Sequence, residues 1–283
     1  MNFDLNDKKE VIALLGAGSM GTAIVRRIAA GKKIFLGDIS EKNLENTANA
    51  LRFCGYDVET QIVDACDKDS IEAYAKKAAE LGDVKYYIHT AGASPSQASP
   101  EKIVELDLIG TTYAIDAFGE VMARGGAGLV VSSQTGYMDA GLTKEDEHEL
   151  ALTPTEELKG LKCIAKENLT SSGKAYMISK RANHLRVRTA ANSWGERGAR
   201  INTISPGIIV TPLAYDEFQA NGDAYQVMID SSPAKRTGTP DEIASAGAFL
   251  LGSEAGFITG TDLLIDGGVI AAIESGRYSL GGR

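Results

Sequence analysis

A tyrosine and a lysine stand four positions apart in the stretch SGKAYMISKRANH, residues 172–184. The stretch has no proline and its apolar residues recur at helical spacing, so Tyr176 and Lys180 should share one face of a helix. A lysine ammonium near a phenol favours the phenolate and lowers the tyrosine pKa from about 10. Such a tyrosine can donate a proton near neutral pH. The spacing also fits two amphipathic side chains on an ordinary helix, so the chemical interpretation needs a partner group.

Ser133 is a candidate partner because it ends a predicted strand, 128–133. The carboxyl ends of parallel strands border the ligand crevice of an open sheet. A hydroxyl at that position can donate a hydrogen bond to a substrate carbonyl oxygen as charge builds on it. Tyr176 would pass a proton to the same oxygen. Ser132 is interpreted as a strand-end hydroxyl that faces away.

A glycine-rich turn, GAGSMG at residues 16–21, connects the predicted strand 10–16 to a predicted helix. Gly16 permits the tight turn, Gly18 lets the backbone approach a pyrophosphate, and Gly21 lets the helix pack on the strand. The start of the helix offers unpaired N–H groups and the positive end of its dipole to the phosphate. In this strand–turn–helix context the motif predicts a bound dinucleotide.

An acidic residue, Asp38, closes the next predicted strand 22 residues after Gly16. A carboxylate at this position can accept hydrogen bonds from the 2′-hydroxyl of an adenosine ribose, and it repels a 2′-phosphate. No basic residue follows directly, so NAD is favoured over NADP. The alternative is that Asp38 caps the following helix.

Composition narrows the class of protein. The chain has 283 residues and a net charge of −9, with Lys and Arg dispersed, so it has no electrostatic footprint for nucleic acid. No apolar run is long enough for a membrane span or follows the polar amino terminus as a signal peptide would. Three cysteines and three histidines are too scattered to predict a metal site, and few cysteines favour the reducing cytoplasm.

Short apolar runs alternate with longer helical patterns along the whole chain, which predicts a parallel sheet covered by helices on both faces. We expect a single α/β domain over 1–283, a doubly wound Rossmann fold with about seven strands. The predicted strands are 10–16, 33–38, 58–64, 84–90, 128–133, 199–205 and 262–266. The predicted helices lie near 19–30, 40–53, 69–81, 100–123, 173–195 and 240–251.

One segment, 136–174, interrupts this alternation and is interpreted as an insertion. Thr153 and Glu156 have the spacing of a capping box, with Pro154 at the first helical position, so we expect a short helix there. The charged run 144–149 is interpreted as a solvated face.

These motifs together resemble the short-chain dehydrogenase/reductase family of the classical type. The resemblance covers nearly the whole chain and rests on motifs in a fixed order. They are the glycine turn at 16–21, VDACD at 63–67, TAG at 90–92, DLIG at 107–110, SS at 132–133, YMISK at 176–180, SPGIIVTP at 205–212, RTGTPDEIA at 236–244 and FITGTDLLIDGG at 257–268.

The resemblance implies roles for individual residues. Tyr176 would be the acid/base, Ser133 would position the substrate, and Lys180 would tune Tyr176 and bind the nicotinamide ribose. Ser133 is preferred over Ser132 because the small residue and glycine that follow the family's serine match Thr135 and Gly136. The implied cofactor contacts are Gly16, Gly18, Ser19, Met20, Gly21, Asp38, Asp64, Ala65, Ala91, Gly92, Tyr176, Lys180, Pro206, Gly207, Ile209 and Thr211.

The chain departs from the family pattern at four places. The glycine turn has the spacing of general dinucleotide folds, and the gap between Ser133 and Tyr176 is longer than usual. Thr90 and Asp107 replace asparagines that the family usually has. The second asparagine anchors a water relay to the lysine, and Asp107 in its place either bonds locally or makes that relay pH-sensitive.

The sequence thus predicts an NAD-dependent oxidoreductase that interconverts a secondary alcohol and a ketone. A hydroxysteroid or bile acid, a 3-oxoacyl thioester, a sugar and another small carbonyl are all open as substrates. The alternative is a catalytically silent dinucleotide-sensing regulator on the same fold. The resemblance also implies a homodimer or homotetramer built through the long helices 100–123 and 173–195 and the last strand, with 269–283 as a tail.

Overall fold

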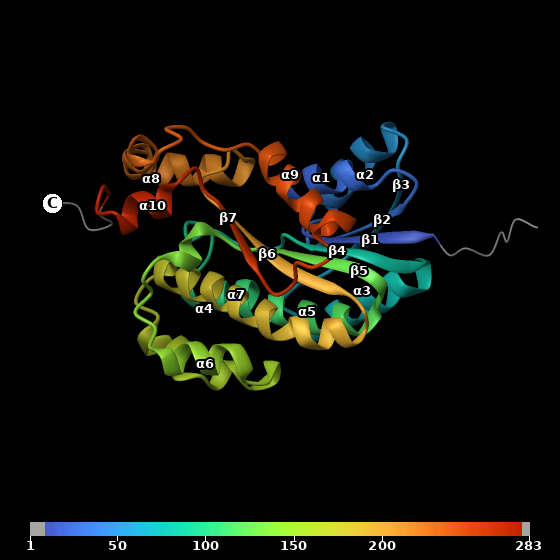
Figure 1. The fold of residues 1–283 in the computed structure, drawn as a ribbon, viewed down its shortest axis with the longest axis horizontal. Helices are drawn as coiled ribbons and strands as arrows, with labels where there is room; N and C mark the ends of the chain where they lie inside the picture. Colours follow the sequence, from blue (N-terminus) through green and yellow to red (C-terminus); the bar gives the residue numbers. More distant parts are fainter. Residues whose placement is uncertain (1–8, 279–283) are drawn as a thin grey trace, which may run out of the picture.

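The computed structural model describes residues 9–278, without the side chains of 213, 216, 217 and 219–221. Its strands form a seven-stranded parallel sheet in the order β3-β2-β1-β4-β5-β6-β7 (Figure 1). The chain starts mid-sheet, winds to one edge and then crosses to the other half, which confirms the doubly wound Rossmann fold. The strands are β1 (Glu10–Leu15), β2 (Lys33–Asp38), β3 (Asp57–Ile62), β4 (Asp83–His89), β5 (Met122–Val131), β6 (Arg200–Pro206) and β7 (Asp262–Ile265).

Successive apolar side chains of a strand point to opposite faces of the sheet, and helices cover both of these apolar faces. In β1, Ile12 and Leu14 pack into one apolar cluster, whereas Val11, Ala13 and Leu15 pack into another. The first cluster includes residues of α1 (Ser19–Ile28), α2 (Glu41–Phe53) and α9 (Pro240–Leu251). The second includes residues of α3 (Lys68–Leu81), α5 (Thr111–Val121) and α7 (Ser172–Glu196).

The helix expected over 100–123 is divided into three parts. The short helix α4 (Pro100–Ile103) passes into a π-helical segment, η1 (Val104–Gly110), which precedes α5. Wide π-helical turns are rare and are frequently found at functional sites. Here the wide turn contains Asp107, which is fully buried.

Two helices near the carboxyl end were not predicted. Thr211 caps α8 (Pro212–Ser231), which lies with α10 (Val269–Glu274) beyond the carboxyl ends of β6 and β7 (Figure 1). The expected tail 269–283 therefore begins with a helix, in which Val269 and Ile270 are buried. Residues 279–283 lie outside the described residues.

The insertion folds over the outer side of α7 (Figure 1). It contains one α-helix, α6 (Lys144–Leu152), and short 3-10 turns. Leu150 and Leu158 of the insertion pack in one cluster with Ile178 and Ala182 of α7. The turns are η2 (Gln134–Tyr137), η3 (Thr155–Gly160), η4 (Lys162–Ile164), η5 (Lys166–Asn168) and, after α9, η6 (Ser253–Ala255).

The predicted capping box at Thr153 and Glu156 is wrong. Thr143 and Asp146 form the capping box, at the start of α6, and Thr153 ends that helix. The charged run 144–149 is therefore helical, and its residues are exposed or half-buried. Burial of Leu150 against α7 favours a helix over this stretch.

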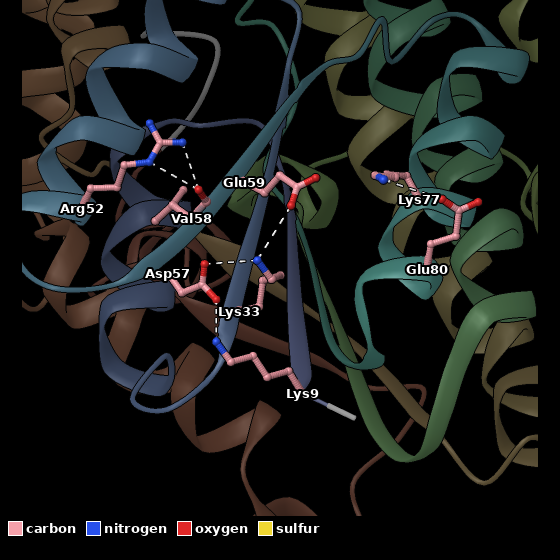
Figure 2. Close-up of polar contacts among 8 residues, drawn as sticks. All are labelled: Lys9, Lys33, Arg52, Asp57, Val58, Glu59, Lys77 and Glu80. Carbon is pink, nitrogen blue, oxygen red and sulfur yellow. Dashed lines mark hydrogen bonds and ion pairs between the residues drawn. The ribbon is translucent and has the colours of Figure 1, made fainter. Parts of the chain in front are cut away.

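A cluster of ion pairs lies at the amino ends of β2 and β3, opposite the ligand crevice (Figure 2). Lys9 Nζ lies 2.7 Å from one carboxylate oxygen of Asp57, and Lys33 Nζ lies 3.1 Å from the other. The hydrogen bond from Lys9 leads the causes that hold the Asp57 pKa below its ordinary value. This cluster joins neighbouring strand ends and contacts none of the predicted site residues.

Candidate active site

The glycine turn has the geometry that a dinucleotide site requires. Gly16 has a φ of 95°, and a Cβ there would lie 2.5 Å from the backbone N of Ala91, so only glycine fits. A Cβ on Gly21 would lie 2.6 Å from a methyl group of Leu14, which shows how closely α1 packs on β1. A Cβ on Gly18 would meet nothing within 4 Å, so its backbone faces open space.

The amino terminus of α1 fits a phosphate group. Gly18 is the N-cap residue, no side chain hydrogen-bonds to the cap, and the first turn contains no acidic residue. Free N–H groups and the positive dipole end therefore face the open space beside Gly18. These observations show that the residues present fit a dinucleotide pyrophosphate.

Thr90 and Asp38 both hold the glycine turn in place. The hydroxyl of Thr90 donates to the carbonyl oxygen of Gly16 at 2.7 Å, so threonine has a structural role where the family usually has asparagine. One carboxylate oxygen of Asp38 accepts the N–H of Ala17, and the other accepts the N–H of Ser40, both at 2.8 Å. Ser40 is the N-cap of α2, so the alternative of Asp38 as the cap is wrong.

Tyr176 and Lys180 lie one turn apart on α7, as predicted. Lys180 Nζ is 5.1 Å from the centroid of the Tyr176 ring. The Ser132 hydroxyl donates to the backbone carbonyl of Lys180 at 2.9 Å, so it fastens β5 to α7. The Ser133 hydroxyl accepts the N–H of Thr135 at 3.2 Å, which leaves its own proton to donate to a ligand.

Lys180 also forms a buried ion pair. Its Nζ lies 3.1 Å from Asp107 Oδ2, while Asp107 Oδ1 accepts the N–H of Ala93 at 2.8 Å. Burial raises the pKa of Asp107, although Lys180 and the Ala93 N–H oppose this rise. Burial alone would lower the pKa of Lys180, but Asp107 and Tyr176 outweigh it and raise that pKa. The pair therefore holds the ammonium in its charged form.

A chain of buried groups leads from this ion pair into the core. The Thr111 hydroxyl donates to the carbonyl of Asp107 at 3.0 Å and lies 3.1 Å from His89 Nε2. Because a hydroxyl has one proton, Thr111 accepts from Nε2–H, and His89 Nδ1 accepts from the Tyr87 hydroxyl at 2.7 Å. Burial, with a contribution from Lys180, lowers the pKa of His89 to about 3, so the ring is neutral.

A second buried network, made of hydrogen bonds, joins α7 to β6 and β7, and it was not predicted from the sequence. His184, one turn after Lys180, lies 2.8 Å from the Ser205 hydroxyl, which donates to Asp262 at 2.9 Å. Tyr137 donates to the other oxygen of Asp262 at 2.7 Å. Burial lowers the pKa of His184 to about 4. A histidine at helical spacing from Lys180 was the only local signal for this network.

Two adjoining pockets bring most of the predicted site residues together, and the residues lining both are Met20, Ser94, Ser132, Tyr176 and Thr211. Among the predicted residues, one pocket is lined by Gly18, Ser19, Met20, Gly92, Asp107, Tyr176, Lys180 and Thr211. The other is lined by Met20, Ser133, Tyr176, Pro206, Gly207, Ile209 and Thr211.

Asp64 and Ala65 follow β3 and line neither pocket. Asp64 accepts the N–H of Cys66 at 2.8 Å, and the carbonyl of Ala65 lies against Gly110. Over residues 9–278 no group of three His, Cys, Asp or Glu side chains is placed to hold a metal ion. Within the same residues, no helix has the length and apolarity to cross a membrane.

The sequence is similar to those of known dehydrogenases and reductases over most of the chain. Residues 10–143 match the family model described as short chain dehydrogenase, and residues 157–270 match that described as enoyl-(acyl carrier protein) reductase. Short-chain dehydrogenase/reductase bsc3 of Alternaria brassicicola is 38% identical over 268 residues, covering 93% of this chain and 96% of that protein. Galactitol 2-dehydrogenase (L-tagatose-forming) of Cereibacter sphaeroides is 29% identical, covering 90% and 93%. Levodione reductase of Leifsonia aquatica is 28% identical, covering 93% and 94%.

Solved structures share the fold. A short-chain dehydrogenase/reductase from Serratia marcescens superposes with a TM-score of 0.72 at 21% identity, covering 93% of this chain and 98% of that one. The structure named gox2181 superposes with a TM-score of 0.73 at 23% identity, covering 94% and 96%.

Proposed function

This chain belongs to the short-chain dehydrogenase/reductase family and is an NAD(P)-dependent oxidoreductase of alcohols and ketones; on that premise we propose that Tyr176 is its acid/base, assisted by Ser133, Lys180 and Asp107. The observation that carries the proposal is the single pocket lined by both Ser133 and Tyr176, with Lys180 beside the phenol ring. When bound, the nicotinamide supplies or takes up the hydride.

The side chains supply the rest of the chemistry. In reduction, the Ser133 O–H donates a hydrogen bond to the substrate carbonyl oxygen, and the Tyr176 O–H gives that oxygen its proton. The charged Lys180 ammonium stabilises the phenolate that remains. In oxidation, the phenolate takes the proton of the alcohol. Asp107 keeps Lys180 charged throughout because their charges lie 3.1 Å apart in a buried site.

The dinucleotide would lie along the carboxyl ends of the strands. Gly18, Ser19 and Met20 would border the pyrophosphate, with Gly16 and Gly21 shaping the turn and Ala91 and Gly92 beside it. Lys180 would bind the nicotinamide ribose, and Ile209 and Thr211 would hold the carboxamide. Asp64 and Ala65 would contact the adenine, and Pro206 and Gly207 would complete the nicotinamide wall.

NAD is the proposed cofactor form. The Asp38 carboxylate stands at the end of β2, where it would repel a 2′-phosphate. Each of its oxygens accepts one backbone N–H, which leaves further lone pairs for a ribose hydroxyl. The ratio of kcat/KM for NADH and NADPH tests this proposal, and a ratio near or below one contradicts it.

Association into a homodimer or homotetramer is also proposed, through the edge strand β7. Leu263 of β7 is 37% exposed and Phe257, in the segment before that strand, is fully exposed, whereas the outer face of α7 packs against the chain's own insertion. Light scattering of the protein and of its Phe257→Glu variant tests this contact.

The free thiols of Cys54, Cys66 and Cys163 support the proposed cytoplasmic location.

The test of the catalytic assignment is the Tyr176→Phe variant. It removes the proton donor and keeps the ring, so turnover with any active ketone should be lost while NADH affinity, followed by fluorescence, stays within about twofold. Turnover retained at the wild-type rate would contradict the role of Tyr176.

A further inference from the structure

The pocket that holds Ser133 and Tyr176 has mainly apolar walls. Its volume is about 170 Å³, and its walls include Pro206, Gly207 and Ile209, which the proposed function assigns to the nicotinamide. Met20 lines it from the glycine turn and Ile208 from the segment after β6. Helix α8 contributes Phe218 and Tyr225, whose ring centroids lie 5.2 Å apart in an edge-on arrangement.

None of the described residues that line this pocket is Asp, Glu, Lys, Arg or His. The nearest cation along α7, Lys180, lines the adjoining pocket, and its charge is already paired with Asp107. A carboxylate or phosphate on the substrate would therefore lose its hydration without gaining a cationic partner. Such an uncompensated charge is strongly disfavoured in an apolar site.

Most polar side chains along the pocket already take part in a hydrogen bond with another residue. The Ser132 hydroxyl donates to the Lys180 carbonyl, Thr211 accepts the N–H of Ala214, and Ser94 bonds with Ser96. Among the described side chains, two buried polar atoms of the lining lack a hydrogen-bond partner, Gln134 Oε1 and Thr135 Oγ1. Ser133 and Thr211 also keep their own hydroxyl protons, so the pocket can still bond to a hydroxyl group of a substrate.

We infer that the substrate is an uncharged ketone, or the corresponding secondary alcohol, with an apolar body beside the reacting carbon. The inference rests on the proposed function, because Ser133 and Tyr176 set the end of the pocket where the carbonyl lies. The apolar body of the substrate would occupy the space bordered by Ile208, Phe218 and Tyr225. Anionic carrier-bound thioesters are excluded as preferred substrates.

The test is a matched substrate panel with NADH. We expect kcat/KM for 4-methylcyclohexanone to exceed that for 4-oxocyclohexanecarboxylate, which has nearly the same ring and adds a charge, by at least about a hundredfold. Equal or higher kcat/KM for the acid overturns the inference, and so does failure to reduce any uncharged ketone in the panel.

Two variants test whether the preference for an uncharged ketone arises in this pocket. Phe218→Arg places a cation in the pocket and should narrow the preference for the uncharged ketone over the acid at least tenfold. Phe249→Arg, on the exposed side of α9, adds the same charge outside the pocket and should leave that preference as it was. An unchanged preference in Phe218→Arg, with NADH binding intact, contradicts the assigned pocket. The Tyr176→Phe experiment decides the proposed function separately, on whichever substrate is reduced.

Discussion

The ammonium of Lys180 lies 3.1 Å from a carboxylate oxygen of Asp107, and both side chains are buried. The two residues come from different elements, α7 and the π-helical segment η1, which meet beside the proposed nicotinamide site. The family resemblance implied an asparagine and a water relay at this position. Here a direct ion pair holds the lysine, and a second Asp107 oxygen bonds locally to the Ala93 N–H.

Replacing Asp107 with the usual family residue should change how the oxidation rate depends on pH. The carboxylate keeps the Lys180 ammonium charged, and that ammonium stabilises the phenolate that oxidation needs. In Asp107→Asn, burial lowers the pKa of Lys180 with less opposition, so the rise of the oxidation rate should move to higher pH, by about one unit. The measurement is kcat against pH in the oxidation direction.

The matched control for this experiment is Asp116→Asn. Asp116 is a partly buried carboxyl on α5 that accepts the Thr155 hydroxyl and contacts no residue of the proposed site. Its variant should keep the wild-type pH profile. A profile that Asp107→Asn leaves unmoved would show that the ion pair does not influence Tyr176.

The two adjacent serines should separate chemistry from structure. Ser133→Ala removes a hydrogen bond to the reacting oxygen and should lower kcat by about 10²–10³-fold. Ser132→Ala removes the bond to the Lys180 carbonyl and should lower the free energy of unfolding by about 1 kcal/mol. Steady-state kinetics and denaturant melts on both variants provide the comparison. The reverse pattern would assign the catalytic role to Ser132.

Two glycines of one turn should respond differently to the same substitution. Gly16→Ala combines a positive φ with a Cβ 2.5 Å from Ala91 N, so the melting temperature should fall by several degrees. Gly18→Ala has open space around its Cβ and should melt near the wild-type temperature. Its NADH affinity should nevertheless fall about tenfold or more, because the methyl group occupies the proposed pyrophosphate position. Wild-type NADH affinity in Gly18→Ala would place the pyrophosphate elsewhere.

His184 should make the fold sensitive to mild acid. Burial lowers its pKa to about 4, whereas the unfolded chain binds the proton below about 6.5. The unfolded state thus binds more protons between these values, so the free energy of unfolding falls as pH drops from 6.5 towards 4, by about 2–3 kcal/mol for this group. In His184→Gln that part of the pH dependence should disappear. Urea melts at several pH values check it, and parallel curves for both proteins would contradict it.

Local patterns predict the strands and the glycine turn, because alternation and tight turns depend on neighbouring residues. The insertion contains two capping-box patterns, at Thr143 and Thr153, and local rules do not choose between them. Contact of Leu150 with α7 favours the first. Helix α8 was missed because Gly222 and several polar residues weaken its apolar pattern.

Part of the site was also predictable because it depends on neighbouring residues. Tyr176 and Lys180 are four positions apart, so helical periodicity brings them together. The ion pair with Asp107 joins residues that are far apart in the sequence, and so does the network from His184 to Asp262. Such contacts depend on how helices dock on the sheet, which no short stretch specifies.

A crystal structure with NAD and a bound secondary alcohol is the most direct test of proton transfer by Tyr176. The phenol oxygen and the Ser133 hydroxyl should both lie within about 3.2 Å of the alcohol oxygen, on the side of the nicotinamide that receives the hydride. A Tyr176 oxygen turned away from the ring, out of reach of that alcohol, would contradict the assignment.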